Sequence, residues 1–129
     1  AFPHEQKVIQ RVQKELGLPF HLHICGSAGP IIEDMVNTTA KVLEIDQDTD
    51  IKVAKSITQG KCVLHGNVEP AKCIFGTPDI VRDLTKLVLT DAMDGGGLIC
   101  GPGCALGGPT PPENIHALCE TVREFGVYH

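Results

Sequence analysis

Apolar residues recur along the chain with two periods, one typical of helices and the other typical of strands. The apolar side chains of residues 4–16 lie at helical spacing, so this stretch is predicted to be an amphipathic helix. Residues 20–25 then alternate at period two, with apolar side chains on one face and His21, His23 and Cys25 on the other. We expect a buried strand here, packed on both faces.

The same change from strand period to helix period recurs along the rest of the chain. Further strands are predicted at residues 42–46, 61–65 and 98–100, and further helices at 30–39, 51–58, 77–91 and from 111 onward. Strict alternation is typical of parallel strands joined by right-handed crossovers. We therefore expect an α/β fold, with one domain over residues 1–129 and four βα units that make up half of a (β/α)8 TIM barrel. A small open parallel sheet covered on both faces is the alternative.

Chemically active side chains follow each predicted strand. They are His23 and Cys25, then Asp46, then Asn67 and Glu69, and finally Cys104. Because the carboxyl ends of parallel strands meet at one edge, and ligands bind there in barrels and in open sheets, we expect these side chains to form one site.

His23, Cys25 and Cys104 are the candidate metal ligands. Residues two apart on a strand point the same way, so His23 and Cys25 present an imidazole and a thiol side by side. Cys104 adds a second thiol from a glycine-rich turn. Three such ligands leave one zinc position open for a substrate, which is typical of catalytic zinc. The alternative is that the three are ordinary core or redox side chains.

Two acidic residues on the second strand are expected to assist this site. Asp46 either orients a ligand or positions the substrate, with a solvated acid as the alternative. Glu44 lies deeper on the same face and needs a partner, for which His21 on the neighbouring strand is the candidate.

The remaining polar and thiol side chains are predicted to have mainly structural roles. Asn67 and Glu69 either cap their loop or contact the substrate. His65 is expected to pack or hydrogen-bond within the sheet, with metal binding as the alternative. The other cysteines are predicted to be small core residues, with Cys100 as a possible substitute ligand; they are Cys62, Cys73, Cys100 and Cys119. His129, at the end of the chain, is expected at the surface.

Composition indicates which partners are disfavoured and which cellular compartment is expected. The net charge of -5 and the lack of a basic cluster disfavour nucleic acid and anionic membranes as partners. There is no long apolar run and no signal-like start, so we expect a cytoplasmic protein. In that compartment six cysteines favour free thiols or metal ligation over disulfides. The chain begins with Ala1 and not with Met, so we expect a fragment or a processed product.

Several short motifs occur in an order that resembles a known family. They are His23-Ile24-Cys25-Gly26, Ile45-Asp46-Gln47, Gly66-Asn67-Val68-Glu69-Pro70, Gly76-Thr77-Pro78 and Gly101-Pro102-Gly103-Cys104. This order resembles the C-terminal half of the uroporphyrinogen decarboxylase superfamily. Within that superfamily, the His-x-Cys pair with the late cysteine is similar to the methylcobamide:coenzyme M methyltransferases of methanogenesis.

The resemblance implies a (β/α)8 barrel of which this chain supplies the last four units. It also implies a zinc held by His23, Cys25 and Cys104 that binds a small thiol such as coenzyme M. The methyl group would come from methylcobalamin on a corrinoid protein. The missing N-terminal half, or a second copy of the chain, would complete the barrel. Two alternatives are a decarboxylase-like enzyme without metal chemistry and a non-catalytic half-barrel binding module.

Overall fold

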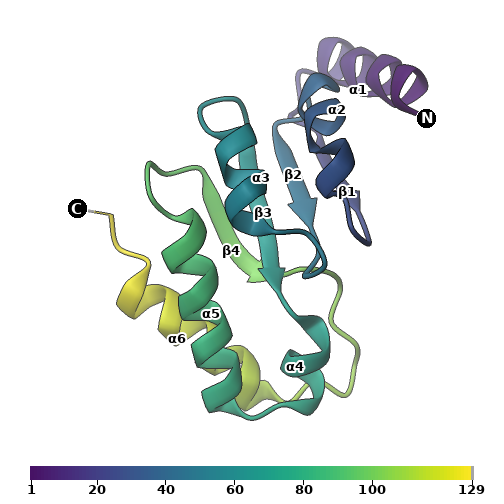
Figure 1. The fold of residues 1–129 in the computed structure, drawn as a ribbon. Coiled ribbons are helices and arrows are strands. Elements are labelled where there is room, and N and C mark those ends of the chain that lie inside the picture. The colour runs from purple at the N-terminus through teal and green to yellow at the C-terminus, as the bar shows by residue number, and fades with distance from the viewer. Residues whose placement is uncertain (129) are drawn as a thin grey trace.

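The computed structural model describes residues 1–128 and contains a parallel sheet of four strands in the order β1-β2-β3-β4 (Figure 1). His129 lies outside the described residues. The strands are β1 (His21–Ile24), β2 (Val42–Ile45), β3 (Val63–Val68) and β4 (Leu98–Pro102). Neighbours in the chain are neighbours in the sheet, as in a barrel wall, whereas doubly wound open sheets reverse their strand order. The four predicted βα units of a barrel half are confirmed.

The helices and turns between the strands are α1 (Phe2–Leu16), η1 (Gly29–Ile31), α2 (Ile32–Asn37), α3 (Ile51–Thr58), α4 (Pro70–Phe75), α5 (Pro78–Ala92) and α6 (Pro112–Phe125). Side chains cap the starts of two of these helices. The Asp50 side chain accepts from two backbone N–H groups of α3, and the Thr77 hydroxyl accepts from one in α5. Among the described residues, no helix is both long enough and apolar enough to cross a membrane.

The helices cover one face of the sheet. In Figure 1, α3 lies in front of the sheet, and α5 lies to the left of β4. On the helix side Leu43, Ile45 and Leu64 are 0% exposed, whereas on the opposite face Ile99 is 46% exposed. The expectation of a first strand packed on both faces is therefore wrong for the described residues, because they place a helix layer on one side only. The open sheet covered on both faces is excluded for the same reason.

Strands β3 and β4 run further than their apolar runs indicate. Gly66 pairs with Cys100 and Asn67 with Gly101, so the segment predicted to be an exit loop is strand. Strand pairing across about 35 residues supplies these hydrogen bonds, and local pattern does not reveal them. The short helix α4 that follows β3 was also not predicted.

The buried face of α6 is polar in part, which corrects the prediction for Cys119. This cysteine is exposed, while Asn114 and Thr121 are buried. The Asn114 amide donates to the carbonyls of Cys73 and Gly76, at 2.9 Å each, so a polar side chain anchors the helix. The other three predicted core cysteines do lie in or against the core; they are Cys62, Cys73 and Cys100.

Candidate metal centre

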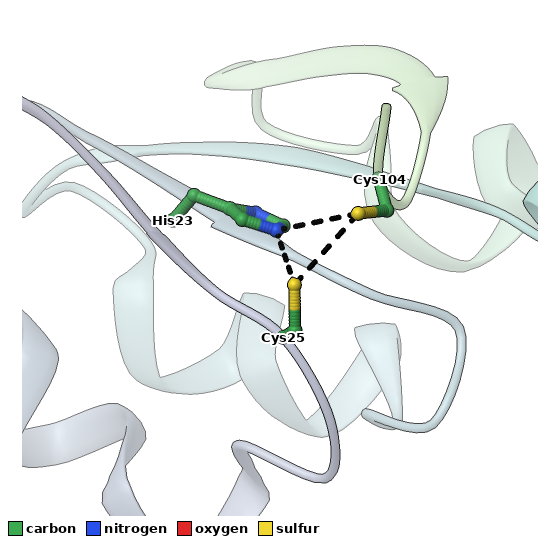
Figure 2. A group of neighbouring side chains, drawn as sticks. All are labelled: His23, Cys25 and Cys104. Carbon is green, nitrogen blue, oxygen red and sulfur yellow. Dashed lines mark hydrogen bonds between the residues drawn. The ribbon is translucent and has the colours of Figure 1, made fainter. Parts of the chain in front are cut away.

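The three predicted ligands converge at the carboxyl edge of the sheet. His23 lies in β1, Cys25 directly after it, and Cys104 in the loop after β4, with the side chains pointing toward one another (Figure 2). His23 Nε2 lies 2.8 Å from Cys25 Sγ and 3.6 Å from Cys104 Sγ. The two sulfur atoms are 3.7 Å apart. The structure thus brings together side chains from the first and the last strand, which are the two outer strands of the sheet.

This triangle fits zinc in its donor types and in two of its three sides. Zn–S bonds of about 2.3 Å and a Zn–N bond of about 2.0 Å at tetrahedral angles separate two sulfurs by about 3.8 Å and nitrogen from sulfur by about 3.6 Å. Both sides that meet at Cys104 match these values. The side between His23 and Cys25 is shorter, but Cys25 is exposed and free to rotate outward.

The electrostatics around Cys25 favour a cation. The hydrogen bond with Cys104 raises the pKa of the Cys25 thiol, and desolvation and the carboxylates of Asp46 and Glu44 raise it further. The Cys25 thiol therefore tends to keep its proton when no cation is bound. A divalent cation reverses this balance, because thiolate ligands lose their repulsion and gain a bond to the metal.

A glycine allows the Cys104 loop to approach the end of β2. The Gly103 N–H donates to the Val68 carbonyl at 2.8 Å. A Cβ atom at Gly103 would lie only 2.8 Å from the Cα of Asp46. The backbone of Asp46 leaves no room for a side chain at position 103. Glycine at this position therefore allows the loop to hold Cys104 close to the end of β2.

Asp46 fixes the backbone that follows Cys25. It is 6% exposed, so the solvated alternative is wrong. One carboxylate oxygen accepts from the Gly26 N–H, and the other accepts from the Asp48 N–H at 3.0 Å. The Asp46 side chain therefore links the loop after β1 to the loop after β2, next to Cys25.

Asn67 lies in β3 and caps the neighbouring loop after β2, not a loop of its own. Its amide donates to the carbonyls of Asp46 and Thr49, at 2.9 and 2.8 Å. Glu69 precedes α4 and lines a cavity of about 590 Å³ together with Asn67. Cys25 and Cys104 do not line that cavity, so it is separate from the metal centre.

Glu44 lies among histidines on the face opposite the helices. Its predicted partner is confirmed, since His21 Nε2 is 3.2 Å from the carboxylate. His65 packs in the sheet as expected, but its Nδ1 is buried without a hydrogen-bond partner. Burial lowers the pKa of His65, with Glu44 opposing the shift in part. Sequence reasoning paired Glu44 with His21 but missed that His65 joins them, which follows from the register of β2 and β3.

Cys100 is not a substitute ligand. Its side chain packs against the core, and burial raises the pKa of its thiol to about 12. Cys100 pairs with Gly66 and so faces the helices together with Leu64, whereas His23 lies on the other face of the sheet.

Comparison with known proteins gives one family. The family model described as uroporphyrinogen decarboxylase (URO-D) matches residues 1–125. The methylcobamide:CoM methyltransferase MtbA of Methanosarcina acetivorans is 30% identical over 97% of this chain and 35% of its own length. A uroporphyrinogen decarboxylase of Legionella pneumophila is 30% identical over 100% of the chain and 36% of its own length.

A solved structure shows the same fold. A methyltransferase from Methanosarcina mazei superposes with a TM-score of 0.81 at 27% sequence identity, over 95% of this chain and 36% of that one. The chain thus spans about a third of the length of the relatives that it matches.

Proposed function

Since the chain belongs to the uroporphyrinogen decarboxylase family, we propose that it is part of a zinc-dependent methyltransferase. The proposed reaction transfers a methyl group from a methylated corrinoid to a small thiol such as coenzyme M. The observation that favours this reaction is the convergence of His23, Cys25 and Cys104 within 3.7 Å of one another. The similarity to methyltransferases over nearly the whole chain supports it.

Zinc held by these three residues would lower the pKa of a bound thiol and so supply a thiolate near neutral pH. Two cysteine ligands leave such a thiolate more nucleophilic than three histidines would, because they donate more charge. Asp46 and Gly103 hold the two loops that present the thiols. The chain's own contribution is therefore a fixed, electron-rich ligand set at the edge of the sheet.

The proposed partners are a corrinoid protein and a second protein surface that completes the barrel. Strands β1 and β4 are the edges of the sheet, and Ile99 on the face opposite the helices is 46% exposed. Open edges and exposed apolar side chains favour pairing with the other barrel half or with a second copy. Sedimentation equilibrium over a wide concentration range tests this, and a monomer at all concentrations would count against it.

Zinc content tests the ligand set. We expect the combination of Cys25→Ala and Cys104→Ala to lower bound zinc by about one equivalent per chain, because the third ligand alone binds weakly. Metal analysis by mass spectrometry measures this. Cys119→Ala, an exposed cysteine on α6, is the matched control and should retain zinc. Undiminished zinc in the double variant would overturn the proposed site.

A decarboxylase-like activity is the second candidate, favoured by the equal identity to the Legionella pneumophila decarboxylase. The two differ in what they consume. Methyl transfer from methylcobalamin to coenzyme M, followed by the appearance of demethylated cobalamin, supports the first. Release of carbon dioxide from uroporphyrinogen, unaffected by Cys25→Ala with Cys104→Ala, would support the second.

A further inference from the structure

A second group of metal-binding side chains surrounds one oxygen atom of Glu44. His21 Nε2 is 3.2 Å from Oε2, and His65 Nδ1 is 3.8 Å from the same atom. We propose that His21, Glu44 and His65 form a second site for a divalent transition-metal ion, separate from the thiols. All three potential ligand atoms lie within 4.8 Å of one another.

Strand register builds this group. Glu44 pairs with His23 on one side and with His65 on the other, and His21 lies two residues before His23. Residues in register on parallel strands, and residues two apart on one strand, share a face. The cluster therefore follows from the sheet itself and does not depend on a loop.

Two ring nitrogens in the cluster lack partners. His65 Nδ1 and His23 Nδ1 are both buried with no hydrogen bond, although each faces the Glu44 carboxylate at 3.8 and 3.5 Å. Buried polar atoms nearly always have a partner, so two such atoms beside one carboxylate need an explanation. A cation that binds the Glu44 carboxylate and the lone pair of His65 Nδ1 accounts for His65, while His23 Nδ1 stays 3.5 Å from the same carboxylate.

The orientation of the His65 ring leaves Nδ1 as its metal-binding atom. A Cβ atom at Gly101 would lie 2.9 Å from His65 Nε2, so that edge of the ring faces the backbone of β4. The glycine gives the ring its place, and Nδ1 then faces Glu44. The ring is thus positioned for a ligand on one side only.

The separations suit a metal of ordinary size. At tetrahedral angles, bonds of about 2.0–2.2 Å to nitrogen and carboxylate oxygen put ligand atoms roughly 3.3–3.6 Å apart. The 3.2 Å contact is slightly shorter and the 3.8 Å contact slightly longer, so small shifts of the side chains bring both into this range. The His21 side chain is 45% exposed, so an ion can enter from the open face. Two imidazoles and a carboxylate suit zinc, cobalt and similar ions.

Cobalt(II) titration of the variant with Cys25→Ala and Cys104→Ala tests the second site without the first. We expect about one equivalent to bind, with weak visible ligand-field bands and no thiolate-to-cobalt charge transfer. Adding His21→Gln or Glu44→Gln should weaken this binding by at least about tenfold, since each removes one of three ligands. His21 is largely exposed, so its replacement leaves the core intact.

His116→Gln on α6, an exposed histidine outside the cluster, is the matched control and should bind cobalt unchanged. Circular dichroism of each variant establishes that it is folded. Two results would overturn the proposal: no cobalt binding in the variant without Cys25 and Cys104, or binding that His21→Gln does not weaken. Because this variant lacks both thiol ligands of the first site, the outcome is independent of the proposed methyltransferase site.

Discussion

The two faces of the sheet are built from alternate residues of the same strands, yet they differ in almost every property. Leu43 and Leu64 face the helices and are 0% exposed. Glu44 and His65, which follow them directly in sequence, face the other way, are partly exposed, and include a buried nitrogen without a partner. One face is closed and apolar, and the other is open and polar.

The difference separates stability from chemistry. The apolar face gains free energy when it packs under α3 and α5, and it needs nothing beyond the described residues. The polar face holds imidazoles and a carboxylate, and the Nδ1 atoms of His23 and His65 have no hydrogen-bond partner among the described residues. Changes on the first face should therefore alter folding, and changes on the second should alter binding.

The largest expected effect is on the apolar face. Leu43→Ala should lower the free energy of unfolding by about 2–5 kcal/mol, because it leaves a cavity in a closed core. Val42→Ala, on the opposite face of the same strand, should cost only about 1 kcal/mol or less. Urea unfolding of the two variants measures both values. Equal losses would mean that the two faces contribute alike.

Asp46→Asn should affect both stability and activity, since Asp46 is buried at the end of β2 beside the metal centre. Loss of the charged hydrogen bonds to the Gly26 and Asp48 N–H groups should cost about 1–3 kcal/mol. Methyl transfer should fall by roughly 10- to 100-fold, with zinc content at saturation unchanged. Asp48→Asn, which makes the same charge change at an exposed position, is the control. Zinc loss at saturation would instead make Asp46 a ligand.

Gly103→Ala should weaken zinc binding and also lower the free energy of unfolding, because Gly103 is buried against backbone. The added Cβ would lie 2.8 Å from backbone at Asp46, so the loop must move and take Cys104 with it. A loss of about tenfold in zinc affinity is expected, as for other groups that hold a ligand in place. Competition with a zinc-binding dye measures the affinity. Gly108→Ala has open space around it and should bind as the parent does.

The sequence predicted what depends on local pattern. The bounds of α3, the cap of α5 and the order of the strands follow from periodicity and capping side chains, and the rule that strand ends meet at one edge brought Cys104 to His23 and Cys25. It missed what depends on partners far away in the chain. The extension of β3 requires β4, and the buried side of α6 requires the carbonyls that Asn114 binds. Tertiary contacts determine the end of β3 and the buried side of α6, so local periodicity cannot predict either of them.

The smallest expected effect compares two cysteines at alkaline pH. Cys100 packs against the core, and burial raises the pKa of its thiol from 9.0 to about 12. Between these values the unfolded chain loses the thiol proton while the folded chain keeps it, so the free energy of unfolding falls as pH rises. The slope from one group is at most about 1.4 kcal/mol per pH unit, and less here because Cys100 is only partly buried. Cys100→Ala should therefore flatten the decline measured by urea unfolding from pH 9 upward, whereas Cys119→Ala, whose thiol is exposed, should follow the parent curve. If both variants follow the parent curve, the Cys100 thiol titrates alike in the folded and unfolded chains, and β4 is more open on its helix side than the packing indicates.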